Sequence, residues 1–264
     1  MNDYELAHHA ASIGAAIVAS HFGVVKSGDL KGRSDPVTIA DREAEAAIVE
    51  FLKTERPDDG ILAEEGSGAA ATGRRWIIDP LDGTVNFMHA IPQVSVSIAL
   101  YDGDQPLVGV IQDVSRDEVF AASFGEGATL DGEPIEVSAT DDLAHAVVGT
   151  GFPYDHHLHA EAYAANLAAV LAEVNGIRRM GSAALDLAWV AAGRLDAYWE
   201  LVLAPWDMAA GVLIVTEAGG RVTTPGGNPL RVGHGGAIAS NRALHRPLTA
   251  CIAGTLPPHL KEDQ

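Results

Sequence analysis

The stretch Trp76-Ile77-Ile78-Asp79-Pro80-Leu81-Asp82-Gly83-Thr84-Val85-Asn86-Phe87 decides how the rest of this chain is interpreted. It begins as an apolar strand, carries one carboxylate at the end of that strand, and reaches a second carboxylate just before a glycine. We expect Pro80 to end the strand ladder, because proline has no N–H to donate. Asp82-Gly83-Thr84 then leads into a helix or turn, so both carboxylates can face one cavity.

Two acidic side chains separated by two residues can serve two divalent cations. Hard cations prefer oxygen ligands, and the free backbone carbonyl of Leu81 lies between Asp79 and Asp82. Paired ions in phosphatases lie ~3.5 to 4 Å apart, where a phosphate oxygen can bridge them. The N–H groups of Gly83 and Thr84 at a helix N-terminus would favour the same anion. Taken alone, however, the two aspartates are better explained as turn and N-cap residues.

Length and charge restrict the class of protein. A chain of 264 residues suits one compact α/β unit. With 36 acidic and 17 basic residues the formal charge is -19, which repels nucleic acids and anionic membranes. A small phosphate ester would meet the same repulsion, so a phosphate substrate implies bound divalent cations. Cys251 is the only cysteine, and no apolar run reaches spanning length. We therefore expect a cytoplasmic protein without disulfide, signal peptide or membrane anchor.

The periodicity of apolar residues divides the chain into two halves. Two amphipathic helices are predicted, one from an N-cap at Asp3 to Gly23 and one from a cap at Thr38 to before Pro57. Residues 1–142 then predict a largely antiparallel sheet, with strands at 61–63, 76–78, 95–101, 107–111 and 119–123. The alternation in 95–101 predicts a strand with one buried face. Residues 143–264 predict an α/β half, with strands near 147, 177, 198, 222 and 238 and helices at 158–174, 183–192, 208–218 and 243–250.

Acidic residues end other segments in the same manner. Glu64-Glu65 follows a short strand, and Trp206-Asp207 stands before a helix that closes with Glu217-Ala218-Gly219-Gly220. With the block 76–87, and in this order, these motifs make the chain resemble the inositol monophosphatase family. The likeness runs from the first helix to about Ala250 and includes Asp35-Pro36-Val37-Thr38 with Asp41, Gly151-Phe152-Pro153-Tyr154-Asp155 and Gly181-Ser182-Ala183-Ala184. It implies one phosphatase domain over 1–264, of the α/β (α+β) class, with the layered αβαβα sandwich of inositol monophosphatases and fructose-1,6-bisphosphatases.

The resemblance also implies roles for the acidic residues. It makes Glu64, Asp79 and the Leu81 carbonyl ligands of one Mg²⁺, and Asp79, Asp82 and Asp207 ligands of a second. Glu65 would serve a looser third ion or orient a neighbouring ligand. In the family a metal-activated water attacks phosphorus, so the implied catalytic residues are Glu64 with Asp41 and Thr84, which position or deprotonate that water. Gly83 and Thr84 would bind the phosphate. Without the other motifs, Asp41 and Thr84 are better explained as helix caps.

The alcohol part of the substrate would meet a separate group of residues. The resemblance assigns this role to Asp82, Gly181, Ser182, Ala183 and Glu200. Hydroxyl groups suit such contacts better than a charged ring does, which favours a polyol over a nucleoside. Glu200 can alternatively end an edge strand in solvent. For Lys31, sequence alone favours a position in a solvated loop. A polar surface loop is expected for His156, His157 and His159. Arg178 and Arg179 could either steer anions or pair with carboxylates, and the sequence leaves both open.

We therefore expect magnesium-dependent hydrolysis of a phosphate monoester, with inositol monophosphate giving inositol and phosphate. Val85-Asn86-Phe87 favours this substrate, because other members more often have lysine after the threonine. The alternatives are a histidinol-phosphate, fructose-1,6-bisphosphate or 3'(2'),5'-bisphosphate nucleotide phosphatase, or a metal-binding regulatory protein without turnover. The resemblance also implies lithium inhibition and a homodimer.

Overall fold

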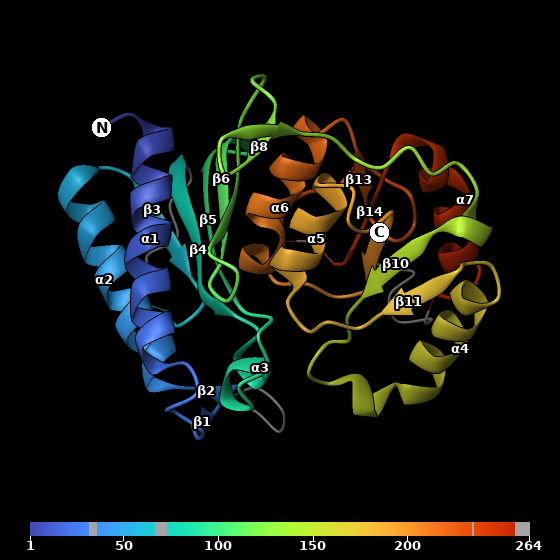
Figure 1. Cartoon of the computed structure of the whole chain (residues 1–264), viewed down its shortest axis with the longest axis horizontal. Helices are drawn as coiled ribbons and strands as arrows, with labels where there is room; N and C mark the ends of the chain where they lie inside the picture. The colour runs from blue at the N-terminus through green and yellow to red at the C-terminus, as the bar shows by residue number, and fades with distance from the viewer. Residues whose placement is uncertain (32–35, 67–72, 234, 257–264) are drawn as a thin grey trace.

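The computed structural model describes residues 1–31, 36–66, 73–233 and 235–256. Their helices and sheets stack as alternating layers, helices–sheet–helices–sheet–helices, which confirms the expected sandwich (Figure 1). Three separate clusters of buried apolar side chains fill the spaces between these layers. Asp35, part of one predicted motif, lies outside the described residues. None of the helices in the described ranges combines the length and the apolar character that crossing a bilayer requires.

Two helices, α1 (Asp3–His21) and α2 (Ile39–Glu55), form the first layer. The N-cap of α1 is Asn2 rather than the predicted Asp3: the Asn2 side chain accepts from the N–H of Glu5, whose carboxylate accepts from the N–H of Asn2. This reciprocal box leaves no capping role for Asp3. Thr38 caps α2 as predicted, again as a reciprocal box, here with Asp41. The capping geometry therefore places Asp41 in the first turn of α2.

The first sheet, seven-stranded within the described residues, has the order β3-β4-β5-β6-β7-β8-β9. Its strands are β3 (Gly60–Ala63), β4 (Arg74–Asp82), β5 (Ser95–Asp102), β6 (Gln105–Asp113), β7 (Glu118–Ser123), β8 (Ala128–Leu130) and β9 (Glu133–Ile135). Only the β3–β4 pair is parallel, so the predicted antiparallel sheet is confirmed. A short ladder of β1 (Asp29–Leu30) and β2 (Pro36–Val37) lies apart from it.

Two details of this sheet differ from expectation. Strand β4 does not end at Pro80 but resumes to Asp82; the ladder with β5 jumps from the Asp79 pair to the Asp82 pair, because Pro80 has no N–H to donate. Strand β5 is buried on both faces rather than one. Ile98 faces α1 and α2, whereas Tyr101 faces the middle helices. Helices cover both faces of the sheet, and this tertiary packing overrides the local alternation.

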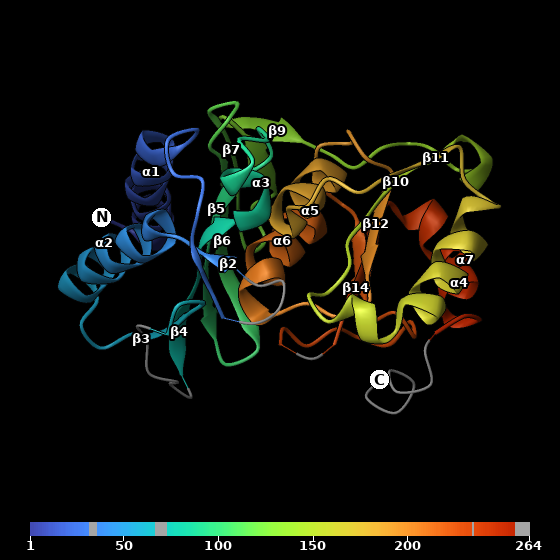
Figure 2. The same ribbon diagram turned by 90° about the horizontal axis from the view of Figure 1, so that it is seen from below.

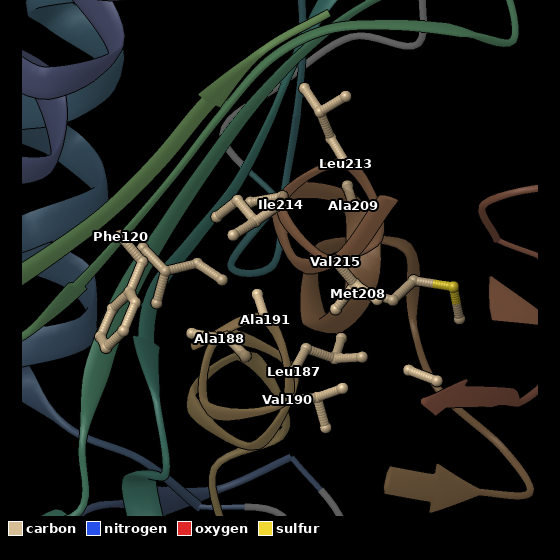
Figure 3. Packing of buried hydrophobic residues seen from close by; sticks show 14 of the residues in the cluster. Phe120, Leu187, Ala188, Val190, Ala191, Met208, Ala209, Leu213, Ile214 and Val215 are labelled. Atoms are coloured by element: carbon tan, nitrogen blue, oxygen red, sulfur yellow. The ribbon is translucent and has the colours of Figure 1, made fainter. Parts of the chain in front are cut away.

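The middle layer consists of α5 (Ala183–Ala191) and α6 (Pro205–Glu217). Figure 3 shows Leu187 and Val190 of α5 beside Met208 of α6, in the cluster that also contains Phe120 of the first sheet. Tyr198 of the second sheet belongs to the same cluster. Both helices are therefore buried between the two sheets, which explains their nearly continuous apolar sequence.

The second sheet has the order β11-β10-β12-β14-β13 within the described residues. Its strands are β10 (Val147–Thr150), β11 (Gly176–Arg178), β12 (Ala197–Glu200), β13 (Arg221–Thr223) and β14 (Ala237–Ser240). The outer helices α4 (Ala160–Leu171) and α7 (Arg242–Ala253) cover its far face, and single turns η1 (Leu143–His145) and η2 (His156–Leu158) lie in the connections. Each strand and helix predicted for this half is present, with shifted ends.

Candidate active site

A cavity of about 580 Å³ lies where the first sheet, the middle helices and the second sheet meet. Figure 2 shows, from below, the first sheet, the helices α5 and α6, and the second sheet following one another. The short helix α3 (Thr84–Met88) directly follows β4, and its Asn86 donates to the carbonyl oxygen of Met180 in the segment before α5. The cavity brings together most of the predicted site residues: Glu64, Asp79, Leu81, Asp82, Gly83, Thr84, Gly181, Ser182, Ala183, Glu200 and Asp207. Asp41 and Glu65 do not line it, although each is close to a residue that does. Segments more than 100 residues apart in sequence thus converge on one space.

Asp79 lies at the centre of the acidic group. It follows Ile77 by two residues, so strand alternation puts it on the face that packs against the middle helices. Its side chain is 2 % exposed, and Oδ1 accepts from the N–H of Leu81 at 3.0 Å. Burial raises the pKa of Asp79 well above its usual value, and the charges of Glu64, Asp82 and Asp207 raise it further. The cavity therefore concentrates negative charge with little water to screen it.

Asp82 joins the first sheet to the middle layer. Its Oδ2 accepts from Ser182 Oγ at 2.5 Å, from the N–H of Ala184 at 2.8 Å and from Ser95 Oγ at 3.4 Å. Ser182 is the N-cap of α5, so the carboxylate lies at the positive end of that helix. Burial raises the pKa of Asp82, while the Ser182 and Ala184 hydrogen bonds oppose the rise. One carboxylate thus faces the cavity and also fixes the start of α5.

Asp207 enters the cavity from the first turn of α6. Pro205 opens this helix, and Asp207 Oδ2 accepts from the N–H of Ala204 at 2.7 Å. Burial raises the pKa of Asp207 well above its usual value, and the neighbouring Asp82 charge adds to the effect. The second half of the chain therefore contributes a carboxylate to the group built on β4.

Lys31 lies in a loop and is exposed, as expected, but it forms an ion pair that the sequence did not predict. Its Nζ donates to Glu64 Oε1 at 3.0 Å and to Glu65 Oε1 at 2.6 Å. Burial raises the pKa of Glu64 to about 7 despite the opposing charge of Lys31. Lys31 and Glu64 lie more than 30 positions apart in the sequence, so the residues around Lys31 do not reveal this ion pair.

Thr84 connects the acidic group to α2. Its Oγ1 lies 3.1 Å from Asp41 Oδ1 and 3.1 Å from the carbonyl oxygen of Leu81. A hydroxyl has one proton, so it bonds to one of these oxygens at a time. Asp41 Oδ2 accepts from the N–H and the hydroxyl of Thr38, and burial raises the pKa of Asp41. The Leu81 carbonyl is therefore within reach of a donor, rather than wholly free as expected.

Gly83 allows the chain to turn from β4 into α3. Its φ of 92° is in the left-handed region, and a Cβ at this position would lie 2.8 Å from the carbonyl oxygen of Gln93. Gly83 is the N-cap of α3 and has no side chain to accept from the first N–H groups of the helix. A larger residue would displace both Thr84 and the wall of the cavity.

Glu200 lies inside the second sheet, so the alternative of a solvent-exposed edge strand is wrong. Strand β12 pairs with β10 on one side and β14 on the other, and Glu200 is 7 % exposed. Its Oε2 accepts from the hydroxyl of Tyr198 at 2.5 Å. Burial raises the pKa of Glu200 to about 7, while Tyr198 and the charge of Arg179 lower it. A Cβ at Gly151 would collide with this carboxylate, which explains the glycine there.

The lining residues without a site role predicted from the sequence include Arg179, Asp186, Tyr198 and His156. His156 and His157 are exposed, in agreement with the surface loop expected for them. Tyr198 has no sequence signal that separates it from other apolar strand residues. Asp186 does have one, because it is the single charged residue in the helical stretch Ala183–Ala191.

The donor set fits a divalent metal ion in chemistry and charge. Glu64, Asp79, Asp82, Asp207 and the Leu81 carbonyl offer only oxygen, which hard cations prefer. Their mutual repulsion, seen in the raised pKa of Asp79, is relieved by a bound cation. Among the residues that the structure describes, no group of three or more His, Cys, Asp or Glu side chains has the closed geometry of a metal site. The fit therefore rests on donor type and charge.

The chain is similar to known proteins over nearly its whole length. Residues 2–259 match the model of a family described as the inositol monophosphatase family. An inositol-1-monophosphatase from Synechocystis is 44 % identical over 95 % of this chain and 88 % of its own length. A Pseudomonas aeruginosa protein named Nus factor SuhB is 42 % identical over 88 % of each chain. The crystal structure of the extragenic suppressor protein suhB from Bartonella henselae superposes with a TM-score of 0.89 at 41 % identity, covering 94 % of this chain and 97 % of that one.

Proposed function

The chain belongs to the inositol monophosphatase family, a family of metal-dependent phosphatases, and we propose that its substrate is inositol monophosphate or a closely related polyol phosphate. As a phosphatase it hydrolyses small phosphate monoesters. The observation that carries the substrate proposal is that one cavity is lined both by carboxylates from the two halves of the chain and by Ser182 and Glu200.

We assign the metal ligands as the resemblance implies: Glu64, Asp79 and the Leu81 carbonyl for one ion, and Asp79, Asp82 and Asp207 for the other. Glu65 would bind a looser third ion or orient the neighbouring ligand Glu64. The proposed ion is Mg²⁺, which the all-oxygen donor set suits. When bound, such ions lower the pKa of a coordinated water and neutralise phosphate charge. The excess of buried negative charge around Asp79 supports this assignment.

The chain's own residues would prepare the attack on phosphorus. Thr84 Oγ1 can donate to Asp41 Oδ1, which leaves the hydroxyl oxygen free to accept a proton from a water molecule. Asp41, held by two bonds from Thr38, then carries the proton away from the reacting water. The N–H groups of Gly83 and Thr84 at the start of α3 would bind the phosphate oxygens. This sequence of contacts requires no covalent intermediate.

The alcohol would contact a second group of residues that line the same cavity. Gly181, Ser182, Ala183 and Glu200 line it, and a partly ionised carboxyl group with a pKa of about 7 can accept a hydrogen bond from a hydroxyl. We further propose that the whole chain, 1–264, acts as one phosphatase domain in the cytoplasm, as a homodimer that lithium inhibits.

A panel of substrates tests the proposal. Phosphate release is measured with and without Mg²⁺ on inositol monophosphate, histidinol phosphate, fructose 1,6-bisphosphate and a 3',5'-bisphosphate nucleotide. We expect the highest kcat/KM for inositol monophosphate, with no turnover when Mg²⁺ is absent. A preference for any other ester overturns the substrate assignment. Relatives named Nus factor SuhB favour one further alternative, a regulatory protein without turnover, and release of no phosphate from any ester would support it.

A further inference from the structure

Asp186 is a buried acid to which the proposed mechanism gives no role. It lies in α5, whose other residues from Ala183 to Ala191 are uncharged. Its side chain is 1 % exposed, yet the residue lines the cavity. Its backbone N–H bonds to the carbonyl oxygen of Ser182, so the helix needs nothing from the carboxyl group. Neither the fold nor the metal site explains an acid at this position.

The carboxyl group of Asp186 is incompletely bonded. No hydrogen-bond partner for its buried Oδ1 is found among the described residues. Leaving such a polar atom unpaired costs about 1–3 kcal/mol, and a residue such as leucine in its place would avoid that cost. Burial raises the pKa of Asp186 well above its usual value, and the charges of Asp82 and Glu200 raise it further. Burial thus favours the protonated form of Asp186, which can donate a hydrogen bond.

The neighbours of Asp186 include residues that we propose to contact the alcohol. A Cβ at Gly149 would lie 3.5 Å from Asp186 Cγ and 3.2 Å from Tyr198 Cδ2, so these two side chains are neighbours. Tyr198 in turn donates to Glu200. The charge of Arg179, another lining residue, lowers the pKa of both Asp186 and Glu200. Asp186 thus lies near Tyr198, which bonds to the proposed alcohol contact Glu200, and among the described residues no hydrogen bond joins Asp186 to the proposed metal ligands.

We propose that Asp186 determines specificity by hydrogen-bonding a hydroxyl of the polyol that lies away from the phosphate ester. The proposal rests on the proposed function and extends it, because it requires an alcohol with a hydroxyl beyond those that reach Glu200. The carboxyl group can turn toward such a hydroxyl, since rotation about χ2 of aspartate is soft. Binding would then supply the partner that Oδ1 lacks.

The test compares an ester rich in hydroxyls with one that has none. kcat and KM are measured with Mg²⁺ for myo-inositol 1-phosphate and for p-nitrophenyl phosphate in the wild type, Asp186→Leu and Asp186→Asn. We expect Asp186→Leu to lose about 10- to 100-fold in kcat/KM on the inositol ester and to stay within about 2-fold on the other. Asp186→Asn keeps a donor and should recover most of the loss. The thermal midpoint of Asp186→Leu should not fall, because an unpaired buried acid has been removed.

Gln112→Met is the matched control. Gln112 also has a buried oxygen for which no partner is found among the described residues, but it does not line the cavity. This variant should leave the ratio of the two kcat/KM values unchanged. Equal losses on both esters in Asp186→Leu and Asp186→Asn, or an unchanged ratio in both, overturn the role of Asp186 alone. A wild type that releases phosphate from neither ester refutes the proposed function itself.

Discussion

Asp82 is a proposed metal ligand and also accepts hydrogen bonds at the start of α5. Replacing it by two different residues can therefore distinguish the effect of its charge from the effect of its hydrogen bonds. In Asp82→Asn the amide oxygen can still accept from Ser182 Oγ and from the N–H of Ala184. In Asp82→Ala both donors lose their acceptor. Each buried donor left unpaired costs about 1–3 kcal/mol, so the alanine variant, with two such donors, should be about 2–6 kcal/mol less stable than the asparagine variant. Both variants remove the charge, so its desolvation cancels in this difference.

Activity should respond differently. Both replacements remove a charged ligand from the proposed Mg²⁺ site, so each should lower kcat for inositol monophosphate by about 100-fold or more. Stability is measured by urea unfolding followed by tryptophan fluorescence, and turnover by phosphate release at saturating Mg²⁺. Asp104→Asn, an exposed aspartate in the β5–β6 hairpin, controls for the loss of one negative charge. Equal unfolding midpoints for the two Asp82 variants would falsify the capping argument, and metal-dependent turnover in Asp82→Asn would refute the ligand assignment.

Three other changes have defined outcomes. Thr84→Val should reduce kcat by about 100-fold, whereas Thr84→Ser should keep most of the activity, because only serine can still donate to Asp41. Phosphate release measures both variants, and an active valine variant contradicts the proposed proton path. Gly151→Ala should displace Glu200 and so raise KM for inositol monophosphate about 10-fold, with little effect on KM for p-nitrophenyl phosphate. If the variant changes KM equally for both esters, Glu200 does not contact the alcohol. Burial, with a smaller contribution from the charge of Arg221, lowers the pKa of His245 from 6.5 to about 4. As the pH falls, His245 is therefore protonated in the unfolded chain before it is protonated in the folded chain. The free energy of unfolding of the wild type should therefore fall by about 3 kcal/mol between pH 6.5 and 4. Urea titrations of His245→Gln should not show this fall. If the free energy of unfolding depends on pH identically in both proteins, His245 is not its cause.

Much of the fold follows from local rules. The box between Thr38 and Asp41 sets the start of α2, and left-handed conformations at Asp131 and Gly132 make the turn between β8 and β9. These features depend on residues within three or four positions of one another, so periodicity and turn chemistry suffice to predict them. The predicted extent of β4 was wrong for a tertiary reason, because pairing with β5 resumes beyond Pro80.

The candidate site divides in the same way. The sequence by itself determined which oxygen donors stand at segment ends, from Asp79 and Asp82 to Asp207, because metal-binding residue types and their spacing are local properties. Tertiary structure alone decided that Lys31 pairs with Glu64, and that Oδ1 of Asp186 finds no hydrogen-bond partner beside the cavity among the residues that the structure describes. Pairing and burial depend on which distant segments meet, and the free energy of burying a charge is set by those neighbours rather than by the residue's place in the chain.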